Sequence, residues 1–390
     1  MTRKAIIKKV HAMKTTVQKI KLAPRNYPKQ TAFVAVFAVL GIILLFITHA
    51  ASIPTADANL VSGTVSGNAT TATDSAGVSY VQFGQTPSPS PSPSPTPTPT
   101  PTPTPGPTPT PGTPCGTATS AHPATYSHVI WIWMENHPWS DIMGNSQAPY
   151  INSLAKACVS SQQTGYDSPY SPSAPNYIAA TSGGTSAGSG DCTPSQCSTT
   201  AQSIFGLLGS GNWKSYSEGE ETNCEPDFGG FNYDVNHNPP VYYSNIAADC
   251  QKYAISLDIH DSSGNETSPF GNLDADLNGN TLPKFSFIAP NLQNDMHDGT
   301  IQQGDTYLSK LIPDILSSSE YKSGSTVVIL TWDEDEGGTG IPFIAISPYA
   351  KVGATFAGPF QHENLLYTTT QWLGLPALGN SNSMRTQLGL

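Results

Sequence analysis

The sequence predicts an α/β domain over residues 115–390, with a mainly parallel central sheet and helices on both of its faces. One observation is that short apolar runs, typical of fully buried strands, alternate with segments of helical periodicity. Another is that acidic or other polar residues directly follow several of these runs. The carboxyl ends of strands line the ligand crevice in α/β proteins, so this placement also predicts a functional site.

Each predicted element has its own pattern. The buried-type strands are His128–Met134, Lys284–Ala289, Thr326–Trp332 and Pro342–Ser347. The helical patterns lie near Tyr150–Ala157, Asn176–Thr181, Ile204–Leu208, Thr306–Leu316 and Glu363–Leu373. Between residues 183 and 203 the chain is rich in Gly, Ser and Thr, which predicts an irregular surface loop. Strands that alternate with helices favour parallel pairing and a sheet covered on both sides.

The first part of the chain carries a membrane signal. Residues 1–30 form a basic head with nine Lys or Arg and no acid, and the uncharged apolar run Ala32–Thr48 follows. Its seventeen residues reach the lower limit of the ~17–25 needed to span a bilayer. The positive-inside rule then places the head in the cytoplasm. We expect residues 31–51 to be a retained signal anchor, with the rest of the chain on the extracellular face of the membrane. A cleaved signal peptide, and thus a secreted protein, is the alternative, since Ala50-Ala51-Ser52 offers a small-residue cleavage site.

A linker and a stalk are expected next. Residues 52–85 are rich in Ala, Ser, Thr and Gly without sustained periodicity, which predicts a disordered linker. Residues 86–114 alternate Pro with Ser or Thr almost without a break. Proline at every second position prevents helix and sheet formation and favours polyproline II, so this proline-rich tract is expected to act as a stalk.

Charge and cysteine content narrow the class of protein. After residue 30, 8 basic and 28 acidic residues give a formal charge of 8 − 28 = −20. Nucleic acid is therefore not an expected partner, because backbone binding depends on clustered Lys and Arg. All six cysteines lie on the predicted outer side, where an even count favours disulfides. Cys192–Cys197 is the first expected pair and Cys224–Cys250 the next; a zinc site is the competing interpretation, but no C-x-x-C pair occurs.

Ser173 is the candidate nucleophile. Pro175 suits the first turn of a helix, so Ser173 is expected just before that helix, where free N–H groups and the helix dipole favour an anion. A serine hydroxyl reacts readily only when a base or a metal lowers its pKa. The alternative is a serine that merely caps the helix.

Candidate metal ligands follow two of the strands. Glu135-Asn136 comes directly after the first strand, and Asp333-Glu334 comes directly after the third. Their oxygens suit Mg²⁺, Ca²⁺ or Mn²⁺ and can also hold Zn²⁺, so a divalent metal ion is the expected cofactor, with its identity open. A helix cap at Glu135 and a solvated acidic loop after Trp332 are the alternatives.

Three histidines and one aspartate complete the candidate site. Asp295 and His297 follow the strand Lys284–Ala289, and either of them could protonate a leaving group. His237 lies in a polar loop, and His362 opens the last predicted helix; both are candidates for substrate binding.

Taken in order, these motifs resemble the bacterial phosphoesterase family that contains acid phosphatases and non-haemolytic phospholipases C. The resemblance covers about residues 125–380 and rests on Glu135-Asn136-His137, Ser173-x-Pro175-Asn176-Tyr177, His237-Asn238-Pro239, Pro290-Asn291 through Asp298, Thr331 to Glu334, His362 and Gly374-Leu375-Pro376. It implies an alkaline-phosphatase-like fold, Ser173 as the nucleophile, and metal binding by Glu135, Asn136, Asp333 and Glu334. It also implies that Asn176 binds substrate and that His237 and His297 lie near the phosphate. Pro138-Trp139 departs from the commoner Ser-Phe after the histidine.

The function expected from sequence is an exported, metal-dependent phosphomonoesterase that forms a phosphoserine intermediate. A phospholipase C that cleaves phosphodiester head groups is the nearest alternative, so the substrate is either a phosphomonoester or a phospholipid. The membrane is an expected partner through the N-terminal segment. A non-catalytic binding module mounted on the stalk is the alternative from a different class.

Overall fold

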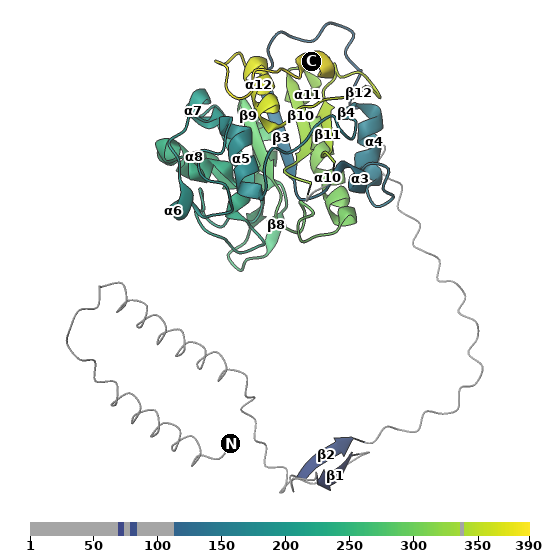
Figure 1. The fold of residues 1–390 in the computed structure, drawn as a ribbon, viewed down its shortest axis with the longest axis vertical. Coiled ribbons are helices and arrows are strands. Elements are labelled where there is room, and N and C mark those ends of the chain that lie inside the picture. The colour runs from purple at the N-terminus through teal and green to yellow at the C-terminus, as the bar shows by residue number, and fades with distance from the viewer. Residues whose placement is uncertain (1–68, 74–78, 84–112, 336–338) are drawn as a thin grey trace, which may run out of the picture. The chain divides into compact units, whose positions relative to one another are not determined.

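The computed structural model describes residues 69–73, 79–83, 113–335 and 339–390 (Figure 1). The chain divides into two units, residues 1–100 and 101–390. In the first, β1 (Ala69–Thr73) pairs antiparallel with β2 (Ser79–Phe83), inside the segment expected to be an unstructured linker. The basic head, the anchor segment 31–51 and all but the last two residues of the stalk lie outside the described residues. Within the part of the chain that is described, no helix has the length and apolar character to cross a bilayer.

The second unit is built on an eight-stranded sheet with the order β12-β4-β11-β10-β3-β9-β5-β6. The strands are β3 (His128–Met134), β4 (Val159–Ser161), β5 (Trp213–Ser217), β6 (Ala254–Ser256), β9 (Phe285–Ala289), β10 (Thr326–Trp332), β11 (Phe343–Ile346) and β12 (Thr355–Phe356). Only the two pairings of β11, with β10 and with β4, are antiparallel. The predicted class, a mainly parallel sheet, is therefore confirmed.

Both faces of this sheet are covered. Every residue of β10 is buried, and so is every residue of β3 except His128. Since successive side chains of a strand point to opposite faces, burial without alternation requires packing on both sides. The helices of this unit include two packed pairs (Figure 1). In one, α5 (Ser173–Ser182) packs against α12 (His362–Trp372), and in the other α10 (Ile301–Ser317) packs against α4 (Pro149–Ala157).

The helices of the described residues are α3 (Trp139–Ile142), α4 (Pro149–Ala157), α5 (Ser173–Ser182), α6 (Pro194–Cys197), α7 (Ile204–Leu208), α8 (Ala247–Tyr253), α9 (Gly271–Gly279), α10 (Ile301–Ser317), α11 (Ser319–Lys322), α12 (His362–Trp372) and α13 (Arg385–Leu388). Five of them, α4, α5, α7, α10 and α12, lie close to the predicted positions. The other six were not predicted, and α6 lies within residues 183–203, where an irregular loop was expected. Short 3-10 turns cover Val235–His237, Pro239–Tyr242 and Ser244–Ile246, and a small hairpin joins β7 (Ile259–His260) to β8 (Glu266–Ser268). One helix differs in a way that matters for the site: α5 begins at Ser173 itself rather than after it.

All six cysteines are in disulfides. The two expected pairs, Cys192–Cys197 and Cys224–Cys250, are present, and Cys115–Cys158 is the third. The Cys115–Cys158 bridge ties the start of this unit to the end of α4. The interpretation of the cysteines as a disulfide framework, rather than a zinc site, is confirmed.

Candidate active site

The register of two central strands creates the centre of the site. In the parallel pair β3–β10, Met134 lies opposite Trp332, so the residues that follow, Glu135 and Asp333, emerge side by side. The Asp333 N–H donates to the Met134 carbonyl at 3.0 Å. The Glu135 N–H donates to the Asp295 carbonyl at 2.9 Å, which brings in the segment after β9. Three acids from three strand ends therefore meet at one edge of the sheet.

Asn136 turns the chain back onto this centre. Its φ of 48° lies in the left-handed region, which asparagine tolerates better than most residues because its side chain is short and polar. In this conformation its N–H donates to Asp333 Oδ1 at 3.1 Å. Backbone strain of this kind is concentrated at functional sites.

Ser173 reaches the same centre from the first turn of α5. It is buried, and its Oγ donates to Glu135 Oε2 at 3.2 Å. The N–H of Ala174, one of the N–H groups at this end of the helix, is bound by Asp191 Oδ1 at 3.0 Å. The hydroxyl is thus oriented by a carboxylate, as a nucleophile requires.

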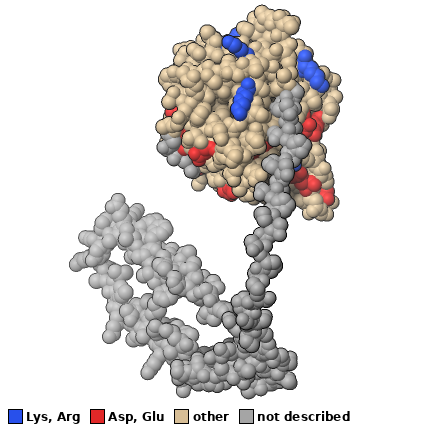
Figure 2. Space-filling model, turned by 90° about the vertical axis from the view of Figure 1, so that its right-hand side faces the viewer, with Lys and Arg blue, Asp and Glu red and all other residues tan. Residues whose placement is uncertain are grey.

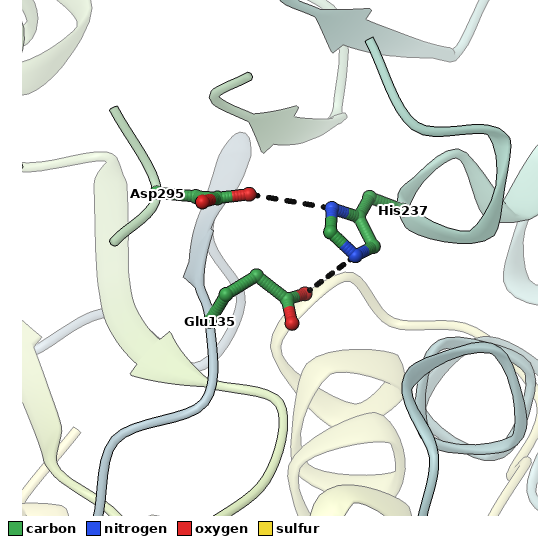
Figure 3. A group of neighbouring side chains, drawn as sticks. All are labelled: Glu135, His237 and Asp295. Atoms are coloured by element: carbon green, nitrogen blue, oxygen red, sulfur yellow. Dashed lines mark ion pairs between the residues drawn. The ribbon is translucent and has the colours of Figure 1, made fainter. Parts of the chain in front are cut away.

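His237 lies between two of the acids (Figure 3). Its Nε2 is 3.3 Å from Glu135 Oε1 and its Nδ1 is 3.3 Å from Asp295 Oδ2. Although burial by itself lowers the pKa of His237, the neighbouring Asp295 carboxylate raises it above its ordinary value. The carboxylates therefore favour a proton on His237 when no cation is bound, whereas an imidazole that binds a metal must be deprotonated.

The acids carry more negative charge than one histidine can balance. Glu135, Asp295 and Asp333 are almost completely buried. Burial raises the pKa of each, and for Glu135 the repulsion from Asp333 and Asp295 raises it further. Buried charges of one sign are unfavourable unless they are paired or coordinate a metal.

The side chains fit a divalent cation. Two buried oxygens, Asn136 Oδ1 and Asp333 Oδ2, have no hydrogen-bond partner. Glu135, His237 and Asp295 each offer a ligand atom, and these atoms lie within 4.8 Å of one another. Oxygen-rich donors with one imidazole are suited to hard or borderline divalent metals. Of the predicted ligands, Glu135, Asn136 and Asp333 come together. Glu334 directly follows Asp333 in the chain and is also buried, but its role as a ligand stays a prediction.

The other predicted site residues lie around this centre. Two of them, Asn176 and His362, use most of their polar side-chain atoms in hydrogen bonds within the chain. The Asn176 amide accepts from the Tyr170 N–H at 3.1 Å and donates to the Tyr170 carbonyl at 2.8 Å. His362 is buried, with Nε2 at 2.7 Å from the Asp333 carbonyl and Nδ1 at 3.0 Å from the Tyr166 hydroxyl. Burial lowers the pKa of His362 to about 4. These hydrogen bonds stabilise the loops of the site. Substrate binding by Asn176 or His362 stays a prediction.

His297 is more accessible than the other two histidines of the site. Its ring centroid is 6.0 Å from that of His237, and its side chain is 36% exposed. Its Nδ1 lies 2.9 Å from Asp298 Oδ1, and its N–H donates to Asp295 Oδ1 at 2.8 Å. His297 is thus the histidine of the site that solvent reaches most readily.

Tyr177 is a site residue to which the sequence analysis assigned no role. Its hydroxyl donates to Glu135 Oε1, and its ring stacks on His237 with centroids 5.2 Å apart and planes 8° apart. The signal was its spacing of four residues from Ser173, since side chains at i and i+4 share one face of a helix. Both therefore reach the Glu135 carboxylate.

A second serine motif is excluded by its position. Gly184-Thr185-Ser186-Ala187-Gly188 has the G-x-S-x-G spacing of a nucleophile elbow. That elbow requires a strand leading into a helix, whereas this segment follows α5 and leads into an irregular loop. Its geometry is therefore not that of a hydrolase triad.

Glu220, which supports the His237 loop, gives a testable pH dependence of stability. Its Oε1 accepts from Asn238 Nδ2 at 3.2 Å and from the Glu225 N–H at 3.0 Å, but burial raises its pKa from 4.5 to about 8. The folded state therefore binds this proton more tightly than the unfolded state. The resulting stabilisation is complete below pH 4.5 and is lost as the pH rises to about 8.

Glu220→Gln keeps a neutral side chain at every pH, so it isolates this contribution. In chelator-containing buffer, the melting temperature of the unmodified chain is expected to fall relative to that of the variant between pH 5 and 8. Thermal denaturation of both proteins across this range is the measurement. Two melting curves that shift in parallel with pH would show that Glu220 is ionised in the folded state.

The class of protein follows from comparison with known sequences. The model of the Phosphoesterase family matches residues 131–376, and the chain belongs to this family. The matched range contains Glu135, Ser173, His237, Asp295 and Asp333, the residues that form the centre of the site. The chain is accordingly a hydrolase of the phosphatase type, acting on phosphoric esters.

Individual relatives are phosphatases. The chain is 30% identical over 267 residues to phosphatidylinositol-3-phosphatase of Mycobacterium tuberculosis. The aligned region covers 68% of this chain and 82% of that protein. It is 26% identical over 234 residues to an acid phosphatase of Aspergillus fumigatus, covering 57% of this chain and 48% of that protein. The chain thus spans about half the length of this fungal relative.

Solved structures show weaker likeness. An alkaline phosphatase superfamily protein from Vibrio parahaemolyticus has 13% identity and a TM-score of 0.43, covering 67% of this chain and 69% of that one. A phosphonate monoester hydrolase from Silicibacter pomeroyi has 12% identity and a TM-score of 0.45, covering 67% and 76%. At these scores neither likeness bears on the chemistry, and the fold class rests on the sheet topology.

Proposed function

We propose that this chain is an exported, metal-dependent phosphomonoesterase that uses Ser173 as its nucleophile. The observation that carries the proposal is the hydrogen bond from Ser173 Oγ to Glu135 Oε2, inside a set of buried carboxylates with unpaired oxygens. A hydroxyl at the N-terminus of a helix, beside ligands for a cation, is placed to receive a phosphoryl group.

The reaction is proposed to have two steps. Ser173 Oγ attacks phosphorus in line, its proton passes to the Glu135 carboxylate, and the bond to the leaving oxygen breaks. Water then cleaves the phosphoserine and releases phosphate, while Ser173 regains a proton. A divalent cation held by Glu135, Asn136 and Asp333 would stabilise negative charge on the phosphoryl oxygens.

The surrounding residues support these steps. His297 is exposed enough to protonate the leaving group, and Asp295 fixes its backbone through Oδ1. His237 lies between Glu135 and Asp295, where its imidazole can bind the cation or an oxygen of the phosphate. Tyr177 and His362 are positioning residues. Tyr177 orients Glu135 by a hydrogen bond and His237 by ring stacking, and His362 lies within hydrogen-bond distance of the Asp333 carbonyl.

The substrate class is proposed from the site and one relative. A phosphomonoester needs a nucleophile, a cation and a proton donor for the leaving group, and all three have candidates here. The mycobacterial relative is named for phosphatidylinositol 3-phosphate, a phosphomonoester on a lipid head group, so this lipid is included as a candidate substrate.

Export is proposed from the order of segments along the chain. The basic head followed by the apolar run Ala32–Thr48 indicates insertion into a membrane, with the enzyme outside. Three disulfides in the described part of the chain are consistent with an oxidising compartment. Membrane fractionation and protease accessibility in intact cells distinguish an anchored from a secreted form.

The function is tested by comparing substrates. The full chain is assayed with p-nitrophenyl phosphate, phosphatidylinositol 3-phosphate and p-nitrophenylphosphorylcholine, each with and without chelator. We expect cleavage of the monoesters that chelator abolishes and added divalent metal restores. Preference for the choline diester would replace this proposal with phospholipase C activity, and full activity after complete metal removal would overturn the metal dependence.

A further inference from the structure

A second group of acids lies at the carboxyl ends of the sheet, outside the proposed catalytic centre. Glu218 follows β5, Asp258 follows β6, and Glu266 belongs to β8. Each offers one carboxylate oxygen, and these oxygens lie within 4.8 Å of one another. Glu218 and Asp258 are only 2% and 4% exposed, whereas Glu266 lies at the surface.

The buried hydroxyl of Tyr307 points to the same place. Tyr307 lies on α10 and is 7% exposed, and within the described residues its hydroxyl makes no hydrogen bond of normal geometry. The acids that act on this hydroxyl are the three members of the group, first of all Glu218, which lies near enough for a weak hydrogen bond. Buried hydroxyls are rarely left unpaired, so this one is an additional oxygen donor directed at the carboxylates.

Little positive charge balances this group. In the described part of the chain, its basic partner is His260, whose Nδ1 is 3.3 Å from Asp258 Oδ2; no ion pair joins a Lys or Arg to any of the three acids. On the face seen in Figure 2, the acidic side chains lie mostly in the lower part of this unit and the few basic ones in the upper part. Buried carboxylates are tolerated when they are paired or bind a metal.

The carboxylates are held in place and still have lone pairs to offer. Glu218 accepts from the Asn291 N–H at 2.9 Å and from Asn294 Nδ2 at 2.8 Å, and Asp258 Oδ1 accepts from the Gly219 N–H at 2.9 Å. Each carboxylate oxygen accepts more than one bond, so these contacts orient the groups without exhausting them.

We propose that Glu218, Asp258 and Glu266, with the Tyr307 hydroxyl nearby, form a second divalent-cation site suited to Ca²⁺. The donors are all oxygens, which favours hard cations over soft ones. The three ligand atoms lie within 4.8 Å of one another, so a single cation can contact all of them. Ca²⁺ is commonly held by several protein carboxylates in flexible geometry, whereas Mg²⁺ demands a near-octahedral shell and usually keeps several waters with one or two carboxylates, so it suits this group less well.

The site adjoins the catalytic centre through one loop. Asn291 and Asn294, which donate to Glu218, belong to the same segment as Asp295. Asp295 in turn pairs with His237. A cation on Glu218 therefore stabilises the segment that carries Asp295, so it supports the active site without contacting a substrate.

The test measures stability rather than turnover, so it is independent of the proposed function. The full chain carrying Asp333→Asn, which weakens the catalytic metal site, is stripped with chelator and titrated with CaCl₂ or MgCl₂ while its melting temperature is followed. Glu266→Gln is the test variant, because Glu266 is exposed and its replacement leaves the core intact. Asp261→Asn is the matched control: it removes one exposed charge from the turn of the same hairpin, where Asp261 Oδ1 accepts from the Ser263 N–H.

Ca²⁺ is expected to raise the melting temperature of the Asp333→Asn protein and of its Asp261→Asn derivative at the same concentrations. Glu266→Gln should need at least about tenfold more Ca²⁺ for the same rise, and Mg²⁺ should act only at higher concentration. If Glu266→Gln titrates like the control, or if Ca²⁺ changes no melting temperature, the site is disproved. A response to Mg²⁺ at lower concentration than Ca²⁺ would overturn the choice of ion.

Discussion

Replacing Ser173 with alanine is expected to lower kcat for phosphomonoesters by about 10⁴-fold or more while the fold is retained. Removal of the nucleophile eliminates the two-step route, and only binding and transition-state stabilisation by other groups remain. The folded state loses the hydrogen bond to Glu135, which is expected to cost about 0.5–1.5 kcal/mol of unfolding free energy. Steady-state kinetics and thermal denaturation of the full chain measure the two effects.

Ser182→Ala is the matched control for this variant. Ser182 lies at the other end of α5, and its hydroxyl donates to the Ile178 carbonyl at 2.8 Å, away from the acids. Its loss should leave kcat within about twofold of the unmodified value, because the partly buried Ser182 hydroxyl bonds only to the backbone carbonyls of Ile178 and Gly184 and to no acid of the site. Near-normal activity of Ser173→Ala would exclude Ser173 as the nucleophile. Acid-quenched reactions should also trap phosphate on the unmodified chain and not on the variant.

Asp333→Asn is the second change with a large expected effect, and here activity and stability should move in opposite directions. The variant removes a ligand oxygen and one negative charge beside Ser173, so kcat/KM is expected to fall by about 10²–10³-fold. In chelator, however, the melting temperature should stay equal or rise, because Glu135, Asp295 and Asp333 repel one another when no cation is bound.

Asp305→Asn provides the contrasting control. Asp305 is also a buried carboxylate, but its two oxygens accept from the N–H groups of Tyr150 and Ile151 at 3.1 and 2.8 Å in the first turn of α4. An amide can accept only one of these bonds, so this variant should lose about 1–3 kcal/mol of stability and keep its chemistry. If Asp333→Asn behaved like Asp305→Asn, with loss of stability and unchanged kcat/KM, its role would be structural.

The central elements of the fold could be predicted because their residues carry their own pattern. The strands β3 and β10 have the predicted bounds, because a continuous apolar run is typical of a strand buried on both faces of a sheet. The helix α7 also has the predicted bounds. Four strands of the eight-stranded sheet, β4, β5, β6 and β12, were not predicted, and neither were the hairpins β1–β2 and β7–β8. They are short or partly polar, as in Thr355–Phe356, and their strand conformation depends on the neighbour with which they pair.

The candidate site was predicted in part for the same reason. Glu135 and Asp333 follow the two most clearly patterned strands, so their meeting at one edge could be expected from sequence. The contact between Tyr177 and His237 could not, because 60 residues separate them and no local pattern specifies it. The second cation site was also missed, since Glu218, Asp258 and Glu266 share no motif and only the strand order β5-β6 and the β7–β8 hairpin bring them together.

The sequence by itself determined the class of fold, the use of the cysteines in disulfides and the ordered motifs of the phosphoesterase family. These depend on periodicity, on local spacing and on residue type at strand ends, all of which are local properties of the chain. The tertiary structure decided which side chains lie together in the site. The strand register sets Met134 opposite Trp332, and packing places His237 between Glu135 and Asp295. It also places His362 within hydrogen-bond distance of the Asp333 carbonyl. Such contacts join segments up to about 200 residues apart, and they depend on strand register and packing rather than on any pattern within a single segment.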